Sequence, residues 1–380
     1  MRESGPQGSS GEEPPVQSFR EKYAIWLSLL VPALLLGLGR GFTAPVIPII
    51  ARDDFQVSVG VAGLAMIAQM LGLVLGTLPT GYIADRWGRR KVLLTAPLLN
   101  AASAFAVFFA QEYYQFMLLL LINGVSLQMW QLGRVSVIAD TGRAGVRGRQ
   151  ITSMSALQRI GTLMGPLLGG IVGEFFGLRI PFILYGFLAL LAFIPMALFI
   201  KETSPSLLAR QRGETYKREA NESWRALLQF PVLVLFGAQF MVNIARGGTV
   251  GNANPFFLFA AFAFGAGAAE LGGISFLAGI VSVPMTLLSG FIMDRFGRKR
   301  GVVPASTVLG FSLGYMAAVA AFDLSFVHFV VSFVFINMAV STMAGSMQTI
   351  GSDIAPVGAR GKFFGVSRLM GEMGSLSNPT

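Results

Sequence analysis

The feature that most constrains this chain is a succession of long apolar runs separated by polar loops. A helix that crosses a lipid bilayer needs about 20 apolar residues. Runs of this kind lie at 24–51, 57–83, 91–110, 115–138, 151–173, 179–200, 229–262, 271–293, 301–322 and 325–350, and an eleventh begins near Phe363. Because lipid offers no hydrogen bonds to backbone groups, each run is expected to be helical. The sequence therefore predicts an all-α integral membrane protein with ten complete spans and part of an eleventh.

The composition excludes several other classes of protein. Charged residues make up 13% of the chain, against about a quarter in a soluble domain. Cysteine is absent, which excludes disulfides and thiol catalysis. The net charge of +10 does not predict nucleic-acid binding, because the positive residues fall mostly in loops and not on a polar helix face with interleaved aromatics. No nucleotide-binding glycine loop, metal-ligand cluster or nucleophile–base pair predicts an enzyme.

The positive residues also predict the orientation of the chain. Twenty-two Lys and Arg residues fall on one side of the alternating spans, and only Arg52 and Arg179 fall in loops on the other. Cytoplasmic loops of membrane proteins carry the excess of Lys and Arg. We therefore expect a multi-pass protein of the cell membrane with a cytoplasmic N-terminus.

Polar stretches divide the chain into four expected parts. Residues 1–22 are rich in Gly, Ser, Pro and Glu and predict a disordered cytoplasmic tail. Residues 23–200 form a first six-helix bundle, and 201–227 a cytoplasmic linker. Residues 228–380 form a second bundle, which we expect to be incomplete because the chain stops at Thr380 within an apolar segment.

The second half of the chain repeats the first at an offset of about 210 residues. The segment GYIADRWGRR at 81–90 returns as GFIMDRFGRK at 290–299. Arg40-Gly41 returns as Arg246-Gly247. Two six-helix halves in parallel repeat are a known transporter design, with the binding site at the membrane midplane between the halves.

The repeated element G-x-x-x-D-R-x-G-R-[RK] resembles the signature of the major facilitator superfamily, and the resemblance covers residues from about 24 to 380. The first glycine of each copy permits close helix packing, and the second permits a turn with positive φ. The resemblance implies a bundle of two six-helix pseudo-repeats, in which this element latches the halves on the cytoplasmic face when the outside is open. The alternative is an anchor that follows the positive-inside rule without gating. The motif residues are Gly81, Asp85, Arg86, Gly88, Arg89, Arg90, Gly290, Asp294, Arg295, Gly297 and Arg298.

A second motif lies in the fifth apolar run. Gly161, Gly165, Pro166, Gly169 and Gly170 resemble the antiporter signature of the drug-exporting branches of that family. Their small side chains form a groove for a neighbouring helix, a pattern also found in membrane helices that export nothing. Pro166 removes a backbone donor and bends the helix.

Two positions depart from those branches. Thr152 stands where the signature has its first glycine, and Leu120 stands where the branches carry an intramembrane arginine. The proton-coupling role of that arginine therefore does not carry over to this chain.

Charged and polar residues within the apolar runs are the candidates for the cavity and for coupling. A charge at the bilayer centre costs about 2.5–3.5 kcal/mol on insertion scales, so it normally faces a cavity or a partner. Glu372 is the only carboxylate clearly inside an apolar run and is either a proton carrier or a structural ion-pair partner of an arginine. Arg134 is either a cavity residue or part of a cytoplasmic gate, and the amides are either substrate contacts or interhelical hydrogen bonds. The candidates are Arg40, Gln131, Arg134, Arg159, Asn243, Arg246, Asn337, Arg368 and Glu372.

The resemblance implies secondary active transport by alternating access, with export of a small amphipathic molecule or drug in exchange for protons. One alternative is a transporter of an anionic metabolite, favoured by the excess of arginine over carboxylate in the spans. Another is a truncated membrane protein that does not transport. We expect a monomer whose partners are a small-molecule substrate, protons and the lipid bilayer, without cofactor, metal or nucleic acid.

Overall fold

The structure is a computed structural model that describes residues 19–141, 147–203, 227–246, 254–343 and several residues between 354 and 374. The tail 1–18 and most of the predicted linker, 204–226, lie outside the described residues. The first half contains α1 (Phe19–Thr43), α2 (Val46–Ile49), the π-helical segment Ile50–Asp54, α3 (Val59–Trp87), α4 (Arg89–Phe108), α5 (Tyr113–Thr141), α6 (Arg147–Phe176) and α7 (Ile180–Phe199). The second contains α9 (Phe230–Arg246), α10 (Pro255–Ala263), α11 (Ala268–Phe296), α12 (Arg298–Ala321) and α13 (Phe326–Met343).

Eight helical segments in the described part of the chain are long and apolar enough to cross a membrane. The helix α6 is not among them, although it has 30 residues, because its glycines and polar residues lower its hydropathy. Large apolar side chains point outward, such as Phe175 and Phe311, which are 76% and 78% exposed. Outward apolar side chains suit a surface that faces lipid.

Two of the predicted spans are interrupted. The run 24–51 is divided at Ala44 and Pro45 into α1, α2 and the π-helical segment. Proline lacks a backbone donor and disfavours helical conformation in the residue before it, which accounts for this break. The run 229–262 is divided into α9 and α10, and residues 247–253 between them are not described.

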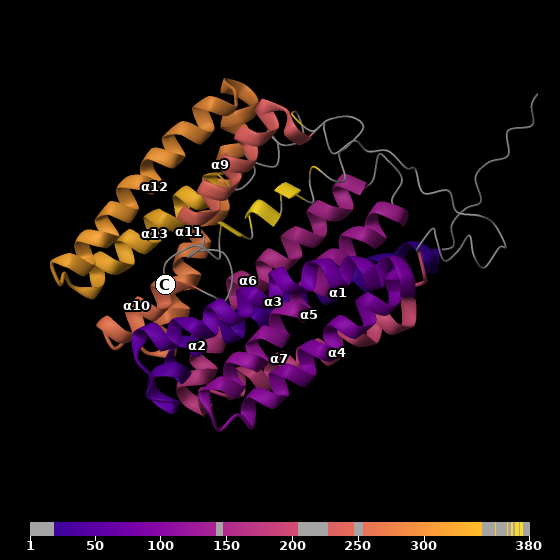
Figure 1. Cartoon of the computed structure of the whole chain (residues 1–380), viewed down its shortest axis with the longest axis horizontal. Helices are drawn as coiled ribbons and strands as arrows, with labels where there is room; N and C mark the ends of the chain where they lie inside the picture. Colours follow the sequence, from indigo (N-terminus) through magenta and orange to yellow (C-terminus); the bar gives the residue numbers. More distant parts are fainter. Residues whose placement is uncertain are drawn as a thin grey trace, which may run out of the picture.

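The helices form two groups, coloured indigo to magenta and orange to yellow in Figure 1. Within the first group α1 packs on α6 and α7, and α5 packs on α3 and α4. Within the second, α13 packs on α11 and α12. The groups meet where α6 packs on α11 and where α10 packs on α2 and α3.

The contacts between the groups define two ends of the bundle. The first turns of α3 pack on α10, where Ala62 and Met66 cluster with Leu258. The start of α11 packs on the last turns of α6. We call this the α10 end, and we call the opposite end, where α3 and α11 both finish, the motif end. The backbones of Asp85 and Asp294 lie in the last turns of α3 and α11, so both lie at the motif end.

Candidate functional site

The second glycines of the repeated motif adopt the predicted backbone conformation. Gly88 has φ 102° between α3 and α4, and Gly297 has φ 84° between α11 and α12. Residues with a Cβ rarely adopt such angles, so glycine is needed for both turns. The two copies of the motif therefore form equivalent helix–turn–helix corners.

The arginines of the first copy make their described contacts within the first half. Arg86 donates to the Tyr82 hydroxyl, and Arg89 donates to the Ser136 carbonyl at 2.7 Å. The Glu202 carboxylate accepts from the backbone N–H groups of Arg89 at 2.9 Å and Arg90 at 3.3 Å. Glu202 thereby caps the first turn of α4, where an anion is favourable. Glu202 was not predicted, although its place directly after the sixth apolar run is visible in the sequence.

The first glycine of the motif does not have the predicted packing in this conformation. A Cβ added at Gly81 would meet no heavy atom within 4 Å, and the neighbouring Tyr82 is 60% exposed. The expectation of close packing at Gly81 is therefore wrong for this state of the molecule. In the second copy, Arg295 lies over the rings of Phe291 and Phe296.

The remaining motif positions leave the latch untested. The side chains of Asp85, Asp294 and Arg298 and the surroundings of Gly290 lie outside what the structure describes. Latching by this motif therefore stays a prediction.

The antiporter-type motif on α6 has two contact faces. On the first face, a Cβ at Gly161 would lie 2.5 Å from the Leu34 carbonyl oxygen, and one at Gly165 would lie 2.6 Å from Gly41 Cα. A Cβ at Gly169 would lie 2.3 Å from Phe42 Cα. These glycines, spaced four residues apart, let α6 and α1 pack backbone to backbone inside the first half.

The second face of the same motif contacts the other half. A Cβ at Gly170 would lie 2.2 Å from the Ala268 carbonyl oxygen, and one at Gly272 would lie 2.2 Å from the Pro166 carbonyl oxygen. Leu163, one turn earlier on α6, lies against Gly279. The motif thus joins one half internally and meets the other half at the α10 end.

Arg134 is the centre of a polar group that joins α5 to α6. Its guanidinium donates to Oε1 of Gln158 on α6 and to Oε1 of Gln131 at 2.9 Å, and it lies 5.7 Å from the centre of the Trp130 ring. Arg134 is buried. Neutral acceptors and an aromatic face stabilise a buried guanidinium. Two of the predicted residues, Gln131 and Arg134, are therefore in contact, and Gln158 belongs with them.

The other candidate arginines have different surroundings. Arg40 lies half-buried in α1 between Gly39, which faces the Tyr185 ring, and Gly41, which packs on α6. Arg159 is exposed on α6. Residues 159, 163, 166 and 170 follow helical spacing, so Arg159 lies on the α11-facing side of α6, toward the motif end.

Two predicted amides bond to their own helices. Asn243 Nδ2 donates to the Gln239 carbonyl at 2.7 Å, and Asn337 Nδ2 donates to the Phe333 carbonyl at 2.8 Å. A Cβ at Gly371 would lie 3.2 Å from Asn243 Nδ2, which places α9 against the eleventh run. Arg368, Glu372 and the side chain of Arg246 lie outside the described residues.

A buried amide network near Leu120 was not predicted. Leu120 is buried among apolar side chains. One turn further, Asn123 Oδ1 accepts from Gln69 Nε2 at 3.0 Å, and Asn100 Nδ2 donates to the Tyr185 hydroxyl at 2.7 Å. These hydrogen bonds link α3 to α5 and α4 to α7 in the membrane-spanning core.

Within the described residues, no group of three or more His, Asp or Glu is placed to hold a metal ion.

Comparison with known proteins agrees with this architecture. The family model of the Major Facilitator Superfamily matches residues 29–379. Multidrug resistance protein 2 of Bacillus subtilis is 25% identical over 346 residues, covering 87% of this chain and 84% of that protein. Quinolone resistance protein NorA of Staphylococcus aureus is 28% identical over 201 residues, and the match spans about half of each protein, 53% and 51%.

Two solved structures share the fold at low sequence identity. A D-xylose-proton symporter superposes with a TM-score of 0.73 at 19% identity, covering 94% of this chain and 88% of that one. A bacterial homologue of the human lysosomal transporter Spinster gives a TM-score of 0.72 at 18% identity, covering 95% and 81%. The chain therefore belongs to the major facilitator superfamily and is a multi-pass membrane transporter of the secondary type, not an enzyme.

Proposed function

We propose that this transporter exports a small amphipathic molecule in exchange for protons, and that the structure represents its inward-facing state. The observation that carries the proposal is where the two halves meet. They pack together at the α10 end through α6 and α11, while Gly81 and Tyr82 at the motif end face open space. Alternating access requires that one end is closed while the other is open.

The loop charges indicate which end of the bundle faces the cytoplasm. Arg86, Arg89 and Arg90 lie at the motif end, whereas Arg52 and Arg179 lie at the α10 end. The positive-inside rule then favours a cytoplasmic motif end and a cytoplasmic N-terminus in the cell membrane. The open end would face the cytoplasm, from which an exporter takes its substrate.

Three features support export and proton coupling. The antiporter-type motif lies where the halves meet, and the relatives Multidrug resistance protein 2 and NorA are named for drug resistance. Glu372 is our proposed proton carrier, because the sequence places this carboxylate within an apolar run, where an ionisable residue is expected to have a function.

The test is transport by purified protein in liposomes with an imposed pH gradient. We expect ethidium to accumulate in the compartment from which protons leave, and a protonophore to abolish the accumulation. Liposomes without protein are the control. Accumulation that is independent of the pH gradient would refute proton exchange, and a complete lack of ethidium movement would refute export of amphipathic cations.

A second candidate function, transport of an anionic metabolite, is favoured by the exposed Arg159 on the α11-facing side of α6. A fixed positive charge along the pathway attracts anions. Competition experiments separate the two functions: carboxylates that inhibit transport where lipophilic cations do not would favour the metabolite.

A further inference from the structure

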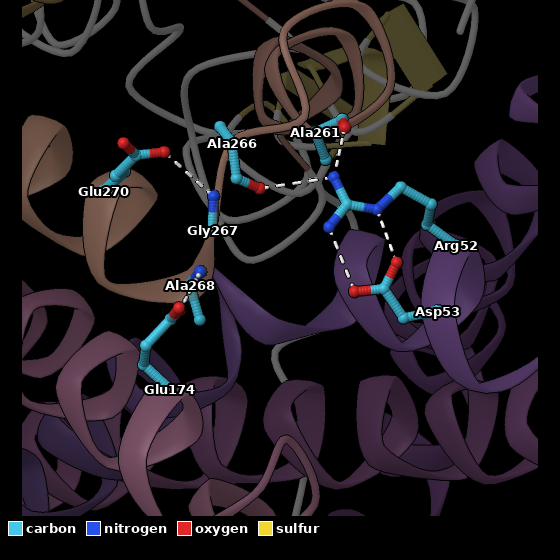
Figure 2. Close-up of polar contacts among 8 residues, drawn as sticks. All are labelled: Arg52, Asp53, Glu174, Ala261, Ala266, Gly267, Ala268 and Glu270. Carbon is cyan, nitrogen blue, oxygen red and sulfur yellow. Dashed lines mark hydrogen bonds and ion pairs between the residues drawn. The ribbon is translucent and has the colours of Figure 1, made fainter.

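The corner between α10 and α11 presents two helix ends of opposite charge to the first half. The last carbonyl groups of α10 carry partial negative charge, and the first N–H groups of α11 carry partial positive charge, because neither set has a partner within its helix. A cation beside the first set and an anion beside the second would both stabilise this corner. The first half supplies one of each (Figure 2).

Arg52, in the π-helical segment after α2, supplies the cation. Its Nη1 donates to the carbonyl of Ala261 in α10 and to that of Ala266 at 3.4 Å. The adjacent Asp53 holds the guanidinium by two hydrogen bonds of 2.6 Å and 3.0 Å. The ion pair with Asp53 fixes the orientation of the Arg52 guanidinium, so that its Nη1 remains available to donate to the second half.

Glu174, in the last turn of α6, supplies the anion. Its Oε2 accepts from the backbone N–H of Ala268 at 3.0 Å and of Ala269 at 3.5 Å. These are the first two residues of α11. Glu174 therefore caps a helix of the other half.

The sequence of α11 lacks a cap of its own at this position. Gly267 precedes the helix and has no side chain that could accept from the first turn. Glu270, three residues later, accepts from the Gly267 N–H at 3.0 Å, which is half of a capping box. Glu174 replaces the missing side-chain cap by accepting from Ala268 and Ala269, and a Cβ at residue 267 would lie 2.9 Å from its Oε2. Glycine leaves room for this carboxylate.

We propose that Arg52 and Glu174 form a lock that holds the α10 end closed. The proposal rests on the alternating access proposed above. When the halves separate at this end, the first turn of α11 loses its cap and the carbonyls of α10 lose their cation. These two residues are positioning residues of the transport cycle, at the end opposite to the repeated motif.

The test is cysteine labelling, for which the chain is suited because it contains no cysteine. Ser275→Cys places a thiol on α11 between Gly272 and Gly279, which pack on α6. Val283→Cys places a thiol four residues beyond Gly279 toward the motif end, where Val283 is 48% exposed. In nanodiscs a water-soluble maleimide reaches both ends, so labelling of residue 275 reports opening of the α10 end and labelling of residue 283 reports opening of the motif end.

We expect Glu174→Gln and Arg52→Gln each to raise the labelling rate of residue 275 about two- to fivefold, the range for one ionised group at a helix end. The same variants should lower the labelling rate of residue 283, because opening of the α10 end is accompanied by closing of the motif end. Glu112→Gln is the matched control, since Glu112 is an exposed carboxylate in the loop after α4 at the same end. It should change neither rate.

Three results would overturn the lock. They are unchanged labelling of residue 275, a change confined to one of the two variants, and a rise at both residues 275 and 283, which indicates a loosened fold. Labelling needs no substrate, so the two proposals fail separately. If the Arg52 and Glu174 variants alter the labelling but the protein transports no drug, only the export proposal is refuted. If the protein transports ethidium but the variants leave the labelling unaltered, only the lock is refuted.

Discussion

Gly272 of α11 lies directly against the backbone of Pro166 of α6: a Cβ at residue 272 would come 2.2 Å from the Pro166 carbonyl oxygen. The next residue, Gly273, would meet nothing within 4 Å if it carried a Cβ. The contact between the halves therefore requires glycine at position 272 of α11, but it does not require glycine at position 273.

This pair predicts opposite effects of the same substitution. Gly273→Ala should leave transport intact and raise stability by up to about 0.5–1 kcal/mol, because alanine is favoured over glycine inside a helix. Gly272→Ala should reduce ethidium transport several-fold, because α6 and α11 can no longer approach at the α10 end. Thermal unfolding and transport of the two purified variants check this. Equal transport in both would show that the close approach is dispensable.

The turn between α3 and α4 gives a second prediction. Gly88 has φ 102° and ψ 155°, a region essentially restricted to glycine, so Gly88→Ala should cost about 1–3 kcal/mol of stability. Gly81→Ala in the same motif should cost none, since Gly81 is helical with free space around it. Denaturant unfolding of the two variants measures the difference. A Gly88→Ala protein as stable as the Gly81→Ala protein would contradict the turn geometry.

The hydrogen bond from Arg134 to Gln158 gives a third prediction. Hydrogen bonds to charged groups contribute about 1.5–3 kcal/mol, and neutral ones about 0.5–1.5 kcal/mol. Gln158→Leu should therefore lower the unfolding temperature more than Gln69→Leu, which removes a neutral hydrogen bond to Asn123. Gln158→Leu should also raise the KM for substrate if the guanidinium is part of the cavity. Equal effects on stability would indicate that Arg134 does not depend on Gln158.

Much of the fold follows from the sequence, because a bilayer permits few structures. Apolar length predicts helices, and the repeat of 81–90 at 290–299 predicts two related halves. The break at Pro45 could have been predicted from the residue itself. The division of the run 229–262 could also have been predicted, because polar and helix-breaking residues interrupt it at Arg246-Gly247-Gly248 and Asn254-Pro255.

The candidate site was less predictable, because it depends on which end of the bundle is closed. Gly81 faces open space in this state, although its motif suggests packing. Glu174 stands at the end of an apolar run and gives no local sign that it caps α11. The sequence feature that points to this cap is the start of α11, where Gly267 and Glu270 form a helix start without a side-chain cap.

Arg159 gives a fourth prediction, which concerns the charge of the substrate. A positive charge about 10 Å from a cationic substrate costs roughly 1–2 kcal/mol at an effective dielectric constant near 20. For an exported amphipathic molecule that is a cation, Arg159→Gln should therefore lower the KM for tetraphenylphosphonium several-fold, while Arg159→Lys should not. Because Arg159 is exposed, neither change should shift the unfolding temperature. A raised KM in Arg159→Gln would favour an anionic substrate.

The central claim is that the two halves close alternately at the two ends of the bundle. It is tested most directly by spin-label distances between paired cysteines, with Tyr82→Cys and Phe291→Cys at the motif end and Glu112→Cys and Phe322→Cys at the α10 end. All four side chains are exposed in the structure. When substrate or a change of pH shifts the equilibrium, the account predicts that the distance at the motif end shortens as the distance at the α10 end lengthens. Distances that change in the same direction at both ends, or that do not change at either, would contradict it.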